Sequence, residues 1–197
     1  MVTIAERIEK LAENLPEGAT IGAKALLHLG SRAAVDQALS RLAREGRLLR
    51  AARGVYVRPI EGRFGARPPA PAKVVEAFAA LKGETIAPNG AAAANTLGLT
   101  TQTPVRQIYL TSGPSRELKI GAQVVELQHA PSWQLVLAER PAGAALRALA
   151  WLGPRQSAKA VRALKRRLPE SERQALSGVS GRLPNWAAKR VGALAHG

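Results

Sequence analysis

The stretch Ser31–Pro59, SRAAVDQALSRLAREGRLLRAARGVYVRP, decides the fold of the N-terminal part of this chain. Its first half predicts an amphipathic helix, because apolar residues recur at helical spacing on one side. These residues are Ala34, Val35, Ala38, Leu39 and Leu42. Ser31 suits the N-cap, where its hydroxyl accepts an orphan backbone N–H, and Gly46 suits the left-handed position that follows a helix. Residues 47–50 and 55–58 then predict two short strands joined by a tight turn.

The opposite face of this helix, and the hairpin after it, are rich in arginine. Residues 31–58 contain seven arginines, no lysine and two acidic residues. Arginine forms forked hydrogen bonds with phosphate groups and with guanine edges. Such a helix fits the major groove of DNA, with the hairpin along the backbone. The same pattern also allows a plain alternative, in which the helix and the hairpin only face solvent.

Two sets of DNA contacts are expected from this stretch. Base contacts are expected from the exposed helix face, at Arg32, Ala33, Asp36, Gln37, Ser40 and Arg41. Phosphate contacts, which position the protein without reading sequence, are expected from Ser31, Arg44, Arg47, Arg50, Arg53 and Arg58. Asp36 would accept a hydrogen bond from cytosine or orient Arg32 through an i,i+4 pair. Arg53 lies at the predicted turn and is a candidate for the minor groove, whereas Tyr56 is expected to pack against the helix.

Two helices are expected before this stretch. The first covers Thr3–Leu15 and begins with a capping box at Thr3 and Glu6. Its apolar stripe is expected to consist of Ile4, Ile8, Leu11 and Leu15. Thr20 is expected to cap a second helix over residues 21–29. Three helices followed by a hairpin is the order of a winged helix-turn-helix.

The chain is therefore expected to contain two domains. The winged helix-turn-helix would cover residues 1–59. Residues 60–72 are rich in proline and glycine and are predicted to form a linker, within which Ile60 and Phe64 are candidates for packing. Residues 73–197 would form the second domain.

The second domain is predicted to have a mixed α+β fold with a small antiparallel sheet. Helices are expected over residues 73–81, 90–97, 132–137, 142–152, 157–168, 171–176 and 185–194. Strands are expected over residues 84–87, 107–111, 117–120 and 123–129.

The net charge of the 197-residue chain is +15, and its isoelectric point is about 11.4. A protein this basic usually meets a polyanion. The excess charge lies in residues 31–58 and 155–190, and the region between them is nearly neutral. In the second zone, four basic residues are spaced to share a helix face: Arg155, Lys159, Arg162 and Arg166. This face is either a second nucleic-acid contact or an ordinary solvated surface.

Several functions are excluded or disfavoured by composition. The chain has no cysteine, which excludes disulfides, thiolate nucleophiles, zinc fingers and iron–sulfur clusters. Its histidines, His28, His129 and His196, do not have metal-ligand spacing. Aspartate occurs once, at Asp36, which disfavours a two-metal nuclease or nucleotidyltransferase. We expect no catalytic residue, cofactor or metal. The acidic, amphipathic N-terminus and the lack of a long apolar run predict a cytoplasmic protein that does not bind membranes.

The sequence also resembles a known family. The runs that carry the resemblance are GSRAAVDQALSRLAREGRLLRAARGVYVRP, PNGAAAANTLGLTTQTP, QIYLTSGPSRELKIGAQVVELQHAP and LPNWAAKRV. In this order they resemble AbiEi-like antitoxins, which are the regulator half of type IV toxin–antitoxin and abortive-infection operons. The resemblance covers nearly the whole chain. It rests mainly on the pairing of the first run with GPSRELKIG and VVELQHAP, because winged helices alone are common.

The resemblance implies a two-domain autorepressor without enzymatic activity. Its winged helix would bind inverted repeats in double-stranded DNA of its own promoter. Its second domain would counter a nucleotidyltransferase-like toxin, without needing a stable complex with it. Two alternatives remain: a stand-alone winged-helix regulator without a toxin partner, and a nucleic-acid-modifying enzyme. The enzyme would use glutamates of the second domain, such as Glu84, Glu117 or Glu126.

Overall fold

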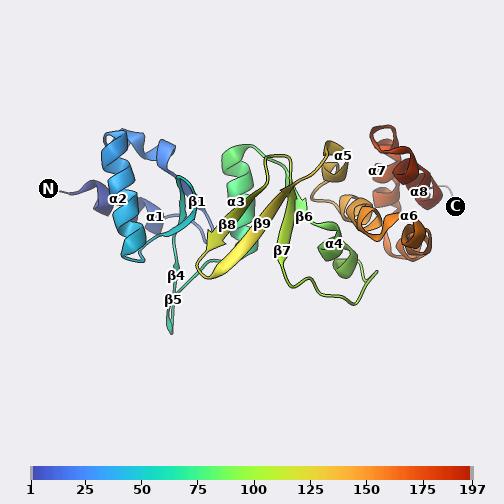
Figure 1. Cartoon of the computed structure of the whole chain (residues 1–197), viewed down its shortest axis with the longest axis horizontal. Coiled ribbons are helices and arrows are strands. Elements are labelled where there is room, and N and C mark those ends of the chain that lie inside the picture. The colour runs from blue at the N-terminus through green and yellow to red at the C-terminus, as the bar shows by residue number, and fades with distance from the viewer. Residues whose placement is uncertain (1, 196–197) are drawn as a thin grey trace. The chain divides into compact units, whose positions relative to one another are not determined.

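A computed structural model describes residues 2–195 and has a mixed α+β fold with small antiparallel sheets (Figure 1). It divides into two compact units. Unit 1 comprises residues 1–84 and 116–126, and unit 2 comprises residues 85–115 and 127–197. Met1, His196 and Gly197, which fall in the expected domains, lie outside the described residues.

Unit 1 begins with a helix and a short strand. Its elements up to the hairpin are α1 (Ile4–Glu13), β1 (Thr20–Gly22), the 3₁₀ helix η1 (Ala23–Leu29), α2 (Arg32–Arg44), β2 (Leu49–Ala52) and β3 (Val55–Val57). The remaining elements are β4 (Ile60–Gly62), β5 (Gly65–Arg67), α3 (Pro71–Lys82) and β8 (Arg116–Ile120). Strands β1, β3 and β2 form an antiparallel sheet in the order β1-β3-β2.

The capping box at the start of α1 is confirmed. The Glu6 backbone N–H donates to the Thr3 hydroxyl, and the Thr3 N–H donates to the Glu6 carboxylate at 2.8 Å. The predicted apolar stripe is only partly correct, because Leu11 and Leu15 are exposed. The buried face of α1 is instead Ala5, Ile8 and Ala12. These residues pack in one cluster with buried residues of η1 and α2.

The expected second helix over residues 21–29 is wrong in its first residues. Residues 20–22 form β1, which pairs with β3 in the register Thr20↔Val57 and Gly22↔Val55. Thr20 therefore caps no helix, and its hydroxyl donates to the Ala77 carbonyl of α3. The rest of this segment is 3₁₀-helical.

The expectation for α2 is confirmed. Ser31 accepts a hydrogen bond from the Ala34 N–H, and Gly46 has a φ of +73° after the helix end. Val35, Leu39 and Leu42 are buried in a cluster with residues of α1 and η1. Tyr56 is buried in the same cluster, as expected.

The predicted linker, residues 60–72, contains regular structure. Strands β4 and β5 form a two-stranded antiparallel hairpin, and α3 already begins at Pro71. The expectation that Phe64 packs is wrong, because this side chain is exposed, whereas Ile60 is partly buried.

Helix α3 belongs to unit 1 rather than to the second domain in which we expected it. Glu17 binds the start of this helix, since its carboxylate accepts from the Lys73 Nζ at 2.7 Å and from the Ala70 N–H at 3.1 Å. Phe78 of α3 has the Arg116 guanidinium of β8 over its ring. These contacts explain why the units do not coincide with the expected ranges 1–59 and 73–197.

Unit 2 combines strands with a helical C-terminal part. Its elements are β6 (Ile86–Pro88), α4 (Gly90–Thr96), β7 (Gln107–Thr111), α5 (Ser132–Leu135), α6 (Pro141–Arg167), α7 (Glu170–Gly178), the 3₁₀ helix η2 (Ser180–Arg182) and α8 (Asn185–Ala195). Strand β9 (Gln123–His129) has residues in both units. Within unit 2, β6 and β7 pair in antiparallel fashion, with Ile86 opposite Thr111.

One long element replaces two expected helices in unit 2. Residues 142–152 and 157–168 lie in α6, which is interrupted at Gly153 by a non-helical conformation with φ of +73°. Pro154 follows, and its ring restricts the residue before it. The expected break is therefore a kink without a loop.

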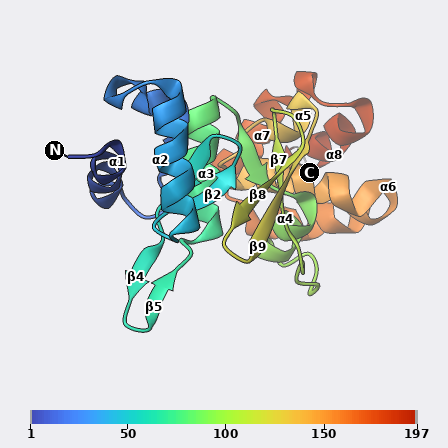
Figure 2. The same ribbon diagram turned by 60° about the vertical axis from the view of Figure 1, so that its left-hand side comes forward.

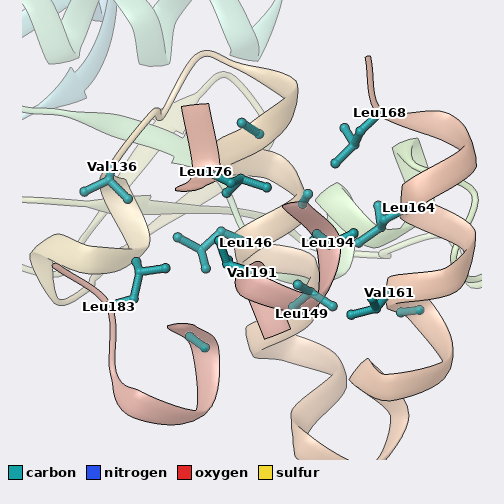
Figure 3. Close-up of a cluster of buried hydrophobic side chains, with 14 residues drawn as sticks. Val136, Leu146, Leu149, Val161, Leu164, Leu168, Leu176, Leu183, Val191 and Leu194 are labelled. Carbon is teal, nitrogen blue, oxygen red and sulfur yellow. The ribbon is translucent and has the colours of Figure 1, made fainter. Parts of the chain in front are cut away.

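The core of unit 2 is a cluster of buried leucines and valines (Figure 3). Leu146 and Leu149 come from the first half of α6, and Leu164 comes from the second half. Figure 3 shows these side chains converging with Leu176 of α7 and Val191 of α8. The cluster holds the two halves of α6 against α7 and α8.

Candidate nucleic-acid interface

The expected base-contacting residues lie together on the outer side of α2. Arg32, Ala33, Gln37, Ser40 and Arg41 are exposed, and Asp36 is partly exposed. Their exposure follows from helical periodicity, since Val35, Leu39 and Leu42 occupy the inner side. A groove of about 660 Å³ is lined on this side by Asp36, Gln37, Ser40, Arg41 and Arg44, and it also contacts residues 3–5 at the start of α1.

Arg32 is held by the only aspartate of the chain. Its Nε donates to the Asp36 carboxylate at 2.8 Å, in the expected i,i+4 geometry. Both side chains are about half exposed, so the pair adds little stability. The pair uses Nε and leaves the two terminal nitrogens for an acceptor. It therefore restricts the orientation of the guanidinium.

The other two arginines of α2 are also directed by local contacts. Arg41 forms an i,i+4 ion pair with Glu45 at 3.7 Å, and Arg44 donates from Nε to the Ser40 carbonyl at 3.4 Å. Both remain exposed. The outer side of α2 thus carries three cations whose positions are restricted by neighbours on the same helix.

Some of the residues expected to contact phosphate bind other residues of the protein, and others do not. Ser31 uses its hydroxyl as the N-cap. Arg47 pairs with Glu9 of α1, and Arg58 donates to the Glu13 carbonyl at 3.2 Å. Arg50 and Arg53 are exposed, and within residues 2–195 their side chains make no hydrogen bond or ion pair. Arg53 lies in the two-residue turn between β2 and β3, as the sequence predicted.

The partners of Arg47 and Arg58 could not be predicted from the sequence. Glu9 and Glu13 lie on α1, more than 35 residues before the arginines that they meet. No local spacing signals such a contact, because it forms only when α1 packs beside the hairpin.

The second basic zone is exposed along the C-terminal half of α6. Arg155, Lys159, Arg162 and Arg166 are all exposed on this half of the helix. Arg155 and Lys159 line a groove of about 490 Å³ together with Gly98 and Leu99. The sequence reasoning missed the half-exposed Trp151, which lines a neighbouring groove. The sequence indicates this residue only by its position, one helical turn before the first basic residue, Arg155.

A buried arginine in unit 2 was also missed. Arg147 of α6 is only 2% exposed, and its Nη2 donates to the Ala138 carbonyl at 3.0 Å. Burial lowers the pKa of Arg147 to about 10, which still leaves the group charged at neutral pH. It lies away from the solvent and belongs to neither basic surface.

The glutamates considered for an enzyme are dispersed. Glu84 forms an ion pair with Arg116 at 2.7 Å, and Glu117 is exposed on β8. Glu126 is partly buried on β9. Among residues 2–195, no group of three or more histidine or acidic side chains is placed to hold a metal ion. No helix in this part of the chain has the length and apolarity needed to span a membrane.

The carboxyl group of Glu17 in unit 1 is expected to make the stability of the protein depend on pH. Hydrogen bonds from Lys73 and from the Ala70 N–H lower the pKa of the Glu17 carboxyl below its ordinary value of 4.5. Its stabilising contribution is thus fully present above that value and is lost as the pH falls through the folded-state pKa. We expect Glu17→Gln to be less stable than the wild type near pH 7, and the difference to shrink in acid.

The measurement is urea unfolding of both proteins, followed by far-UV circular dichroism, from about pH 7 to about pH 3. Glu172, whose pKa is lowered by Arg140 and the Ala142 N–H, is unchanged in both proteins and cancels in the comparison. Parallel curves over the whole range would show that Glu17 titrates alike in the folded and unfolded chain.

Most of the chain matches one known protein family. A family described as one of unknown function, DUF6088, matches residues 7–174, which include the arginine-rich surface of α2 and the first half of α7. The chain belongs to the DUF6088 family. No curated protein matches this DUF6088 chain significantly.

A solved structure with a similar fold is the crystal structure of the RV2827C protein from Mycobacterium tuberculosis. The similarity has a TM-score of 0.53 and covers 99% of the DUF6088 chain and 77% of the other chain. The two sequences are 19% identical. At this identity the similarity concerns the fold alone.

Proposed function

We propose that this DUF6088 protein is a cytoplasmic, DNA-binding transcriptional repressor of its own promoter. The observation that carries the proposal is the outer side of α2, where Arg32, Gln37 and Arg41 are exposed, and the following hairpin, where Arg50 and Arg53 are exposed and make no ion pair within residues 2–195. Arginine and glutamine side chains on one helix face can pair with guanine and adenine edges in the major groove. Flanking arginines can hold the phosphates on either side.

We further propose that residues 1–59 form a winged helix-turn-helix. The element order α1-β1-η1-α2-β2-β3 supports this, with η1 and α2 as the helix pair and β2–β3 as the wing. Strand β1 joins the hairpin in the order β1-β3-β2, which ties the helix pair to the wing. On this arrangement α2 is the recognition helix, and Arg53 at the turn of the wing is placed for the backbone or the minor groove.

The proposed biological role is that of an antitoxin in a type IV, AbiE-like operon. Its support is the sequence resemblance to AbiEi-like antitoxins, which covers both units. The expected partner is a nucleotidyltransferase-like toxin, with which no stable complex is needed. A stand-alone regulator without a toxin remains the alternative. Co-expression with the neighbouring gene distinguishes them, since only an antitoxin restores the growth of cells that produce the toxin.

The first experiment is an anisotropy titration of the full chain against its own upstream DNA and a scrambled duplex, over a range of salt. A preference for the promoter of about 10³-fold or more supports the repressor. Equal affinity for both duplexes with a steep salt dependence would reject autoregulation, because the arginines would then supply charge without reading sequence.

Substitutions in the two classes of contact are expected to affect DNA binding differently. We expect Arg32→Ala and Gln37→Ala to weaken promoter binding by about 1–3 kcal/mol and to relax the preference at one base position each. Arg50→Ala and Arg53→Ala should weaken binding to every sequence and reduce the salt slope by about one phosphate. Titrations against promoters with single base changes measure both effects. If all four variants lose affinity alike on every duplex, the division between reading and positioning is wrong.

A further inference from the structure

The hairpin β4–β5 is an arm with a two-residue tip. Its register pairs Ile60 with Arg67 and Gly62 with Gly65, which leaves Arg63 and Phe64 as the turn. The two strands pair only with each other. In Figures 1 and 2 the hairpin extends away from α1, α2 and α3 of unit 1.

Phe64 is presented to solvent at this tip. Its side chain is 98% exposed, and every residue from 61 to 67 is exposed as well. A phenyl ring gains free energy when it leaves water, and an isolated two-stranded hairpin gains little from its own packing. The chain therefore holds an aromatic side chain where no described residue covers it.

Glycines make the tip narrow. A Cβ on Gly62 would lie 3.2 Å from the Gly65 carbonyl oxygen, so a side chain there would crowd the opposite strand. Gly65 has a φ of +102°, which side-chain-bearing residues rarely adopt. Only Arg63 and Phe64 therefore project at the end of the arm.

The base of the arm is fixed to unit 1. Pro59 and Pro69, on either side of the hairpin, are buried. Arg58 donates to the Glu13 carbonyl of α1, and the Glu17 carboxylate accepts from the Ala70 N–H and contacts Arg67 at 3.5 Å. The arm is thus anchored by the same unit that carries the arginines of α2.

The positive charge at the tip of the arm favours an anionic partner. The hairpin itself, residues 60–67, contains two arginines, Arg63 and Arg67, against one acid, Glu61, and Arg67 is paired with Glu17 at the base. Arg63 makes no hydrogen bond or ion pair with another residue of the described range 2–195. A protein pocket would need an acidic side chain at its rim to receive both the ring and the adjacent cation. A narrow groove between two phosphate backbones receives both.

We propose that the β4–β5 arm enters the minor groove of DNA and that Phe64 wedges between two base pairs. Apolar wedges in the minor groove partly unstack a base step and kink the duplex. Arg63 lies beside the phosphates that line the groove. The inference rests on the proposed DNA-binding function and adds a second contact, which bends the operator while α2 reads it.

The test uses the full chain and promoter duplexes that carry 2-aminopurine at successive positions. Unstacking raises the fluorescence of this base, so the wild type is expected to raise it at one step. A duplex labelled at both ends for energy transfer reports the bend. Phe64→Ala is expected to abolish the fluorescence rise, to reduce the bend and to raise the Kd about 5- to 150-fold. Phe64→Trp is expected to retain the unstacking and the bend.

Val105→Ala is the matched control, because Val105 is also fully exposed but lies in unit 2. It is expected to leave the fluorescence rise, the bend and the Kd unchanged. Circular dichroism spectra that overlay with the wild type confirm that the Phe64 variants are folded.

The outcomes separate the inference from the proposed function. If the wild type prefers its promoter and Phe64→Ala leaves the unstacking and the bend intact, the wedge is overturned and the repressor stands. If the wild type shows no preference for its promoter, the proposed function fails first. If Phe64→Ala instead turns a dimer into a monomer in light scattering without altering the bend, the tip contacts a second copy and the wedge is overturned.

Discussion

Gly143→Ala is expected to lower the free energy of unfolding of unit 2 by about 1–3 kcal/mol. Gly143 is buried in the first turn of α6, where the preceding segment crosses it closely. A Cβ at this position would lie 2.0 Å from the Leu137 carbonyl oxygen and 2.6 Å from its carbon. These are backbone atoms, and Leu137 already has a φ of +54°. The segment therefore cannot move aside without losing its own hydrogen bond to the Arg140 N–H.

The measurement is denaturant unfolding followed by tryptophan fluorescence. It reports on unit 2 alone, because Trp133, Trp151 and Trp186 all belong to that unit. The first and last of these stack edge to face at 5.9 Å, so their emission depends on the packing of the helical core.

Gly192→Ala is the matched control with the opposite sign. Gly192 lies within α8, and beyond its chain neighbours and the backbone of its own helix no atom lies within 4 Å of a Cβ built there. Alanine has a higher helix propensity, so this variant is expected to gain about 0.5–1 kcal/mol. A similar loss at both glycines would show that the close approach at Gly143 is not what limits the side chain.

Leu39→Ala is expected to lower the free energy of unfolding of unit 1 by about 2–5 kcal/mol. Leu39 is fully buried on the inner side of α2, in a cluster with Ile8 of α1 and Leu26 of η1. Its removal leaves a cavity in the cluster formed by α1, η1 and α2. Because Ser40 and Arg41 follow on the outer side, the same change should loosen the proposed recognition surface.

Hydrogen exchange resolved by peptide is the measurement, since the tryptophans do not report on unit 1. Amides of α2 are expected to exchange faster, by the factor that corresponds to the decrease in the free energy of unfolding. Amides of α8 are expected to keep their exchange rates. Leu27→Ala, at a 43% exposed position of η1, serves as the control and should change stability by less than about 1 kcal/mol. Equal effects of the two leucines would contradict the assignment of the core.

The parts of the fold that were predicted correctly are those signalled by neighbouring residues. Helix α2 and its cap at Ser31 follow from the hydroxyl, the apolar spacing and the glycine at the end. The strands of residues 107–111 and 123–129 follow from runs bounded by turn residues. For the same reason the polar composition of the outer face of α2 was visible in the sequence.

The parts that were missed depend on residues far apart in the chain. Residues 20–22 form a strand only because β3 offers a free edge, and a hydroxyl that looked like a cap instead binds α3. The hairpin at residues 60–67 was not predicted, because its prolines and glycines are also typical of linkers. The engagement of Arg47 and Arg58, in contrast to the free Arg50, likewise required α1 to be placed.

The sequence by itself determined where the main helices and strands lie, which face of α2 is apolar and how strongly basic the chain is. These properties arise from side-chain spacing and backbone preferences that act over one or two turns. Only the tertiary structure decided which arginines are free, that α3 belongs to unit 1 and that Phe64 stands at the end of an arm. These depend on contacts between distant segments, whose free energy appears only when the chain is packed.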